Sequence, residues 1–191
     1  MASKKGTMQK DIAALTEEIF KKKLELHQLR REMGAMPVEN YRFQNLDGQW
    51  VTLDSLFNEN GDLIVVHNMG KSCAYCTLWA DGFIGFAPHL LSQTAFVLVT
   101  PDPPEVAREF AKSRGWNFPI VCDIDEEFSK AVGFLIPEKG WWPGASGFKL
   151  RDGKITRVAF DYFGPFDDYC SPFHLFELLE GGRKDWCPDL S

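Results

Sequence analysis

Two uninterrupted apolar runs of strand length, separated by a helix-length segment, constrain the fold of this chain most strongly. The runs are residues 63–67 (Leu-Ile-Val-Val-His) and 95–100 (Ala-Phe-Val-Leu-Val-Thr), and residues 76–91 lie between them. A strand that is apolar at every position is typical of a strand covered on both faces. A crossover of this length joins parallel strands in a right-handed sense. The pattern therefore predicts an α/β protein with helices on both faces of its sheet.

Turn and helix signals extend this unit into a mixed sheet. Asp-Gly turns at 47–48 and 152–153 predict two hairpins, and short helices are expected near 104–114, 126–132 and 173–180. The first hairpin joins residues 41–43 to 50–53, the second joins 148–150 to 155–160, and 118–122 is strand-like. We expect parallel strands in the middle of the sheet and a hairpin followed by a helix at the end of the chain.

A long N-terminal helix is predicted over residues 10–33, which contain no Gly or Pro. Its apolar positions follow a 3,4 spacing, except that Lys22 takes one position that should be apolar. This narrow seam resembles that of a coiled coil and can bury itself on the protein's own sheet or on a second copy. Gly34 and Pro37 end the helix. We therefore divide the chain into a helical extension, 1–36, and a main domain, 37–191.

Composition excludes several classes of function. The 191 residues suit one domain, and the net charge of −6 argues against a protein that binds nucleic acid through a basic face. No apolar run has the length of a membrane span, and the basic start leads into no signal-peptide segment. Five cysteines are too few, and an odd number, for a secreted disulfide scaffold. We expect a cytoplasmic protein whose thiols are mostly reduced.

The motif Cys73-Ala74-Tyr75-Cys76 lies between a predicted buried strand and a predicted helix. A helix N-terminus offers unpaired N–H groups and a partial positive charge, both of which favour a thiolate. We assign Cys73 as the attacking thiol, with Lys71 adding positive charge nearby, and Cys76, one turn along, as the resolving thiol. The alternatives are inert thiols or a zinc site. Zinc would need two further ligands, for which the tail offers only the isolated Cys170, His174 and Cys187.

The region from about residue 41 to 180 resembles the thioredoxin superfamily, and within it the peroxiredoxin-like branch with an extra N-terminal hairpin. Residues 73–89 (CAYCTLWADGFIGFAPH), the Gly-Trp-x-Phe-Pro at 115–119 and the Pro-Gly-x-Ser at 143–146 are similar to a thioredoxin-like family catalogued as domain of unknown function 899. The resemblance implies a thioredoxin-like fold. It also implies a cis-proline facing the dithiol; counted back from the turn at 152–153, that place falls near Ala145 or Ser146, two residues after Pro143. A peroxidatic site implies Thr three residues before its cysteine, where this chain has Gly70.

Several other residues are candidates for the same site. Asp81 on the predicted helix is expected to accept a proton from Cys76, although such a residue more often faces solvent or caps a neighbour. His67 lies near Cys73 or is an ordinary buried histidine. For substrate binding we assign the Gly/Pro-rich loop with Trp141, Trp142 and Pro143, together with Tyr75; packing against the N-terminal helix is the alternative for the two tryptophans. Cys122, Cys170 and Cys187 are taken as structural, with a Cys170–Cys187 pair left open.

These observations favour a dithiol–disulfide oxidoreductase that uses Cys73 and Cys76 and needs no prosthetic group and no metal. Its expected partners are a disulfide-bearing protein or small-thiol substrate and an external thiol as electron donor, with no nucleic acid and no membrane. Two alternatives remain. One is a non-catalytic thioredoxin-like interaction protein that forms a homodimer through its N-terminal helix, and the other is a thiol peroxidase that uses Cys73.

Overall fold

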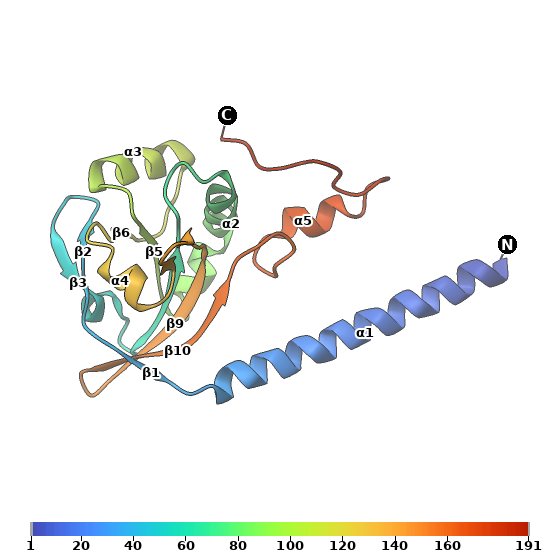
Figure 1. Cartoon of the computed structure of the whole chain (residues 1–191), viewed down its shortest axis with the longest axis horizontal. Helices are drawn as coiled ribbons and strands as arrows, with labels where there is room; N and C mark the ends of the chain where they lie inside the picture. Colours follow the sequence, from blue (N-terminus) through green and yellow to red (C-terminus); the bar gives the residue numbers. More distant parts are fainter. Residues whose placement is uncertain (1, 191) are drawn as a thin grey trace. The chain divides into compact units, whose positions relative to one another are not determined.

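The computed structural model describes residues 2–190. The chain divides into two compact units between residues 35 and 36. The first unit contains α1 (Ala2–Glu32), which begins eight residues earlier than the sequence pattern predicts (Figure 1). None of the helices described is long and apolar enough to cross a membrane.

The second unit is built on one eight-stranded mixed sheet (Figure 1). Its strands, from one edge to the other, are β1 (Met36–Val38), β10 (Lys154–Tyr162), β9 (Gly144–Arg151), β4 (Asp62–His67), β5 (Ala95–Thr100), β6 (Ile120–Cys122), β2 (Arg42–Asn45) and β3 (Trp50–Thr52). β4, β5 and β6 are parallel, and every other pairing is antiparallel. A separate two-stranded sheet pairs β7 (Leu135–Ile136) with β8 (Gly140–Trp141). The mixed sheet and both predicted hairpins are therefore present.

Helices cover both faces of this sheet, because the central strands are apolar on both sides. Val66 and Leu98 pack in one core cluster with side chains of α2 (Ala74–Leu91), α3 (Pro104–Arg114) and α5 (Ser171–Phe176). Val65 and Val97, one residue earlier on β4 and β5, belong to a second cluster with α4 (Glu127–Ala131) and the 3-10 helix η1 (Leu53–Leu56). Successive strand residues point to opposite faces, so the apolar run supplies both cores.

In the second unit, the main differences from the sequence prediction are longer strands and three strands that the sequence pattern does not indicate. β9 is eight residues long and begins four residues before the predicted run, whereas β10, at nine residues, exceeds its predicted run by one residue at its start and two at its end. β1 was missed, because Pro37 indicates only a helix stop, yet the segment pairs antiparallel with β10. β7 and β8 were also missed, because two-residue strands have no periodicity to detect.

Gly144 at the start of β9 shows how tightly this end of the sheet is packed. A Cβ atom at this position would overlap the carbonyl oxygen of Asp161 and lie 2.5 Å from Cε1 of Phe134. We expect Gly144→Ala to lower the free energy of unfolding by about 2–3 kcal/mol, as overpacking of a filled core does. Gly147→Ala is the matched control on the same strand, because its Cβ would meet only Val158 Cγ2, at 3.4 Å. Urea denaturation of both variants checks this, and equal stabilities would contradict it.

Candidate dithiol site

Cys73 lies at the N-terminus of α2, after a five-residue loop that follows β4. Its backbone is extended and its side chain caps the helix, since Sγ accepts a hydrogen bond from the backbone N–H of Cys76 at 3.1 Å. Its carbonyl oxygen accepts from the backbone N–H of Thr77 at 3.0 Å and from the Thr77 hydroxyl at 3.1 Å. The strand–turn–helix context predicted from the sequence therefore brings the first sulfur to the unpaired N–H groups of a helix N-terminus.

The surroundings of Cys73 favour its thiolate. The pKa of Cys73 is lowered to about 7, first by a side-chain hydrogen bond from Cys76 and then by the backbone N–H groups of Cys76 and Tyr75. Burial acts in the opposite direction but is incomplete, because Cys73 is only half-buried. At neutral pH a large share of Cys73 is therefore the nucleophilic form, and the sulfur remains accessible.

Cys76 has the opposite character. The residue is 3% exposed, and the pKa of its thiol is raised far above the ordinary value. The largest cause is the hydrogen bond that it gives to the Cys73 sulfur, followed by burial and by the negative charge of Cys73. The two thiols therefore share one proton, which stays on Cys76 while Cys73 is charged.

The loop before Cys73 is held in place by the carboxylate of Asp102, which follows β5. Its Oδ2 accepts hydrogen bonds from the backbone N–H of Lys71 at 2.7 Å and from the hydroxyl of Thr100 at 3.0 Å. Gly70 has a φ of +96°, and a Cβ there would lie 3.1 Å from Asp102 Oδ1, so a larger residue is disfavoured. Our sequence reasoning missed Asp102, although its place after a parallel strand is the signal by which it could have been found.

The predicted substrate-binding loop lies at the same end of the sheet. Pro143 immediately precedes β9, whose first residue, Gly144, is the register partner of His67 at the end of β4. β9 begins earlier than the turn count predicts, so Pro143 occupies the place before the strand, and its peptide bond is trans. Trp142 is 40% exposed and packs edge-on against Tyr162, with ring centroids 5.7 Å apart, while Trp141 is half-buried.

Tyr75, between the two cysteines, is partly buried on the α2 side of the sheet. Its ring stacks on Phe173 of α5 with centroids 6.2 Å apart, and it also contacts Trp79. These contacts are a sufficient structural reason for an aromatic residue here. The assignment of Tyr75 and the tryptophan loop to substrate binding stays a prediction.

Asp81 forms an ion pair and hydrogen bonds with residues at the C-terminal end of α3 and just after it. It is paired with Arg114, and its Oδ1 accepts from the indole N–H of Trp116 at 2.8 Å. These contacts tie α2 to α3, which is a sufficient structural reason for a carboxylate here. Its predicted role as a proton acceptor for Cys76 remains a prediction that a variant can test.

We expect Asp81→Asn to lower the free energy of unfolding by about 1 kcal/mol, because the partly exposed guanidinium of Arg114 loses its charged partner. The pKa of Cys73 should stay near 7, since Asp81 is not among the groups that lower it. Denaturation and thiol titration of the same variant separate the two roles. A slower release of product from the mixed disulfide, with unchanged stability, would favour the proton acceptor instead.

His67 does not face the dithiol. The residue is 3% exposed, and its ring stacks on Phe134 with centroids 3.6 Å apart, in the core cluster on the opposite face from α2. Nε2 and the Ser146 hydroxyl are 2.9 Å apart, and burial, together with the charge of Arg157, holds the His67 pKa well below its ordinary value. His67 is therefore a buried neutral histidine.

The three remaining cysteines lie outside this arrangement. Cys122 and Cys170 are buried, which raises their pKa values to about 12 and about 11, whereas Cys187 is exposed. All five cysteines are free thiols. Over the described part of the chain, no group of three or more His, Cys, Asp or Glu side chains is arranged to hold a metal ion.

The sheet order defines a thioredoxin-like fold. The Cys-x-x-Cys at the N-terminus of α2, the helix that follows β4, adds a dithiol site. The chain belongs to the family described as "Bacterial protein of unknown function (DUF899)", whose model matches residues 7–188. No curated protein is significantly similar to it in sequence.

Solved structures support the fold independently. PrxQ from Xylella fastidiosa, solved as a Cys-to-Ser mutant, is similar with a TM-score of 0.58 and 14% identity over 67% of this chain and 84% of that one. The bacterioferritin comigratory protein of Xanthomonas campestris gives 0.53 and 17%, over 64% and 80%. A hypothetical protein from Sinorhizobium meliloti gives 0.52 and 15%, over 82% and 87%. At such identities the likeness concerns the fold alone.

Proposed function

We propose that this protein is a dithiol–disulfide oxidoreductase. The Cys73 thiolate attacks one sulfur of a substrate disulfide; a bond forms between Cys73 and that sulfur, and the other substrate sulfur leaves as a thiolate that takes a proton from water. Cys76 then loses its proton and attacks the Cys73 sulfur, which releases the second substrate thiol and leaves a Cys73–Cys76 disulfide. Two electrons pass to the substrate, and two equivalents of an external thiol restore the dithiol.

The observation that carries the proposal is the difference between two thiols one helical turn apart. Cys73 is half-exposed and accepts the Cys76 N–H, and its pKa is lowered to about 7. Cys76 is buried, and its pKa is raised. An attacking thiol needs access and a pKa close to the ambient pH, whereas a resolving thiol should stay protonated until the first step is complete.

Formation of the mixed disulfide would itself activate Cys76. Two of the three causes that raise its pKa, the hydrogen bond to the Cys73 sulfur and the charge of that sulfur, require a Cys73 thiolate. Once Cys73 is bonded to substrate, its sulfur is neutral and only burial remains. The pKa of Cys76 should then fall, so the resolving thiolate forms only when there is a mixed disulfide to break.

The substrate class that fits is a protein disulfide or a small disulfide that reaches a half-exposed sulfur. We assign its docking surface to the loop with Trp141, Trp142 and Pro143, because this loop enters β9 at the end of the sheet from which the dithiol loop leaves β4. Tyr75 contributes from the first turn of α2. An external thiol as electron donor suits the cytoplasm, where thiols are kept reduced.

Reduction of insulin and of hydroxyethyl disulfide, with glutathione or dithiothreitol as donor, tests the proposal. Cys73→Ser should lower the rate by at least about a hundredfold, because no other thiol has this environment. Cys76→Ser should instead accumulate a mixed disulfide on Cys73, which intact-mass spectrometry detects. Cys187→Ser, a change at an exposed thiol outside the site, should leave the rate unchanged.

The same variants separate the alternatives. Equal rates for wild type and Cys73→Ser would exclude the oxidoreductase and leave a non-catalytic thioredoxin-like interaction protein. A second candidate substrate is a peroxide, because the similar Xanthomonas campestris protein is described by its alkyl peroxide reduction activity. Consumption of peroxide that depends on Cys73 and exceeds disulfide reduction would make this chain a thiol peroxidase.

A further inference from the structure

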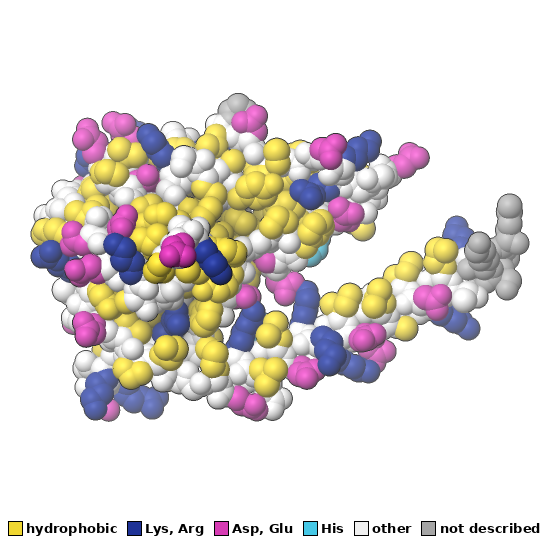
Figure 2. All heavy atoms as spheres, in the orientation of Figure 1, with side chains coloured by type: hydrophobic (Ala, Val, Ile, Leu, Met, Phe, Trp, Pro, Cys, Tyr) yellow, Lys and Arg dark blue, Asp and Glu magenta, His cyan; other side chains and the backbone are white. Residues whose placement is uncertain are grey.

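One face of α1 carries an apolar seam with heptad spacing. Ile12, Ile19, Leu26 and Met33 take heptad position a, and Leu15, Lys22 and Leu29 take position d. The six apolar side chains of this seam are 46–61% exposed. Figure 2 shows hydrophobic side chains along α1, interspersed with charged ones of both signs. Phe20 and Leu24 are also exposed but fall at outer heptad positions, away from the seam.

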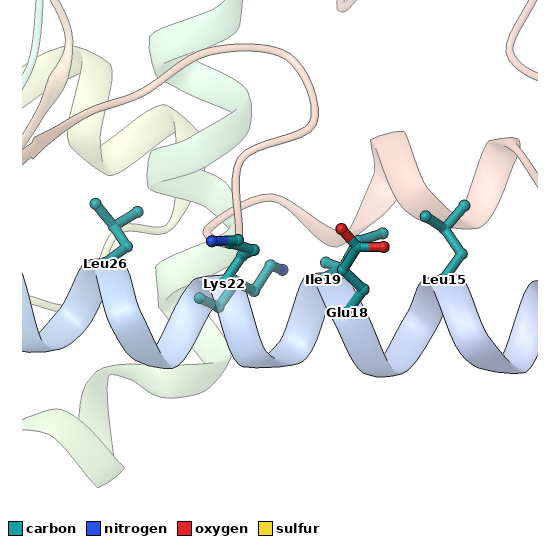
Figure 3. A pocket seen from close by; sticks show the side chains of 6 residues that line it. Leu15, Glu18, Ile19, Lys22 and Leu26 are labelled. Carbon is teal, nitrogen blue, oxygen red and sulfur yellow. The ribbon is translucent and has the colours of Figure 1, made fainter.

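The middle of the seam forms a groove of about 280 Å³ (Figure 3). Its lining consists of Leu15, Glu18, Ile19, Lys22, Lys23 and Leu26. In a two-stranded coiled coil, each a or d side chain enters a hole formed by four residues of the facing helix. Two successive holes of this kind would be bounded by residues 15, 18, 19 and 22 and by residues 19, 22, 23 and 26, which together are the six residues of the groove.

The charges beside the seam indicate which helix fits it. Position g is acidic in four successive heptads, at Asp11, Glu18, Glu25 and Glu32. Position e is Thr16, Lys23 and Arg30. In a parallel pair of helices, g of one helix faces e of the next heptad in the other, whereas an antiparallel pair brings g to g and e to e. A parallel second copy therefore joins acid to base, and an antiparallel one opposes like charges.

We propose that α1 pairs with α1 of a second copy of this chain as a parallel, two-stranded coiled coil. Glu18 faces Lys23 of the partner subunit, and Glu25 faces Arg30 of the partner subunit. Ile at a and Leu at d favour this oligomer and orientation. The seam is complementary to itself in charge as well as in shape. A second copy of α1 is therefore the partner that fits this face.

Lys22 is the one polar residue in a core layer. Its ammonium group forms an ion pair with Glu25 of its own helix at 2.8 Å, which draws the charge away from the seam. A lone polar core residue weakens a coiled coil but fixes its register and number of strands. We expect Lys22→Leu to tighten the dimer about tenfold or more and to make higher oligomers accessible.

The solution mass of the full chain tests the proposal. Analytical ultracentrifugation should give twice the chain mass of 21.7 kDa. Glu18→Lys should raise the dimer dissociation constant at least about tenfold, because it places like charges beside the seam. Glu17→Lys makes the same charge change on the outer face of the helix and should not. Cys73→Ser leaves the mass unchanged, so failure of the proposed activity and failure of the dimer are separate results.

Orientation is tested by cross-linking. With Leu29→Cys, mild oxidation should produce a disulfide that joins the two copies at position 29, identified as a peptide pair by mass spectrometry. Only a parallel pair brings these positions together.

A monomeric wild type at hundreds of micromolar would overturn the proposal. Equal weakening by Glu18→Lys and Glu17→Lys, or a dimer without this cross-link, would overturn it as well.

Discussion

The pKa of Cys73 should rise from about 7 toward the ~8.5 of a free thiol when Cys76 is replaced by Ala. The largest cause of the lowered pKa is the side-chain hydrogen bond from Cys76, and Ala has no donor. At pH 7 the thiolate share of Cys73 would fall from about one half to about 3%, and alkylation would slow about fifteenfold. The pH dependence of iodoacetamide labelling, read at the Cys73 peptide by mass spectrometry, measures this.

Cys76→Ser is the matched control, because a hydroxyl keeps a donor of similar size at the same place. Its Cys73 pKa should remain near 7, while both variants lose the resolving thiol equally. A pKa that stays near 7 in Cys76→Ala as well would show that the backbone N–H groups at the start of α2 suffice. That result would remove the proton-sharing account and leave helix capping as the cause.

The second large effect is expected on acidification. The His67 pKa is held well below its ordinary value in the folded protein, mainly by burial, whereas the unfolded chain binds a proton at an ordinary pKa near 6.5. Below pH 6.5 the unfolded state therefore binds more protons, and stability falls as the pH falls. The loss from this residue is about 1.4 kcal/mol per pH unit until the folded pKa is reached.

His67→Phe should remove this part of the pH dependence, since a phenyl ring can still stack on Phe134 and has nothing to titrate. Urea unfolding at pH 7, 6, 5 and 4.5 should give a shallower slope for this variant than for wild type. His89→Phe changes an exposed histidine on α2, and its curve should run parallel to that of wild type. Parallel curves for all three proteins would show that His67 carries no proton-linked stability.

The dithiol could be placed from the sequence because its setting is local. A buried strand, a short loop and a helix follow one another within residues 63–91, so the register of one segment positions both sulfurs. The hairpins were predictable for the same reason, since an Asp-Gly turn determines which residues face each other across it. The structure agrees at β2–β3 and at β9–β10.

Contacts between segments distant in the chain could not be predicted in this way. Asp81 meets Arg114 and Trp116, 33 and 35 residues away, and only the packing of α2 beside α3 makes that contact. His67 ends an apolar strand just before the dithiol loop, but its ring lies on the opposite side of the sheet, against Phe134 and Ser146 from distant parts of the chain. A short distance along the sequence therefore does not make a residue part of the site.

The carboxylate of Asp102 makes the geometry at Cys73 depend on a second segment of the chain. This one group accepts hydrogen bonds from both Lys71 and Thr100. The connection that follows β5 therefore holds the loop before the reactive cysteine in position. Adding or deleting a residue between positions 100 and 103 would thus displace the sulfur while leaving every residue of the motif intact. Natural or engineered variation in that connection is a means of tuning reactivity from outside the Cys-x-x-Cys itself.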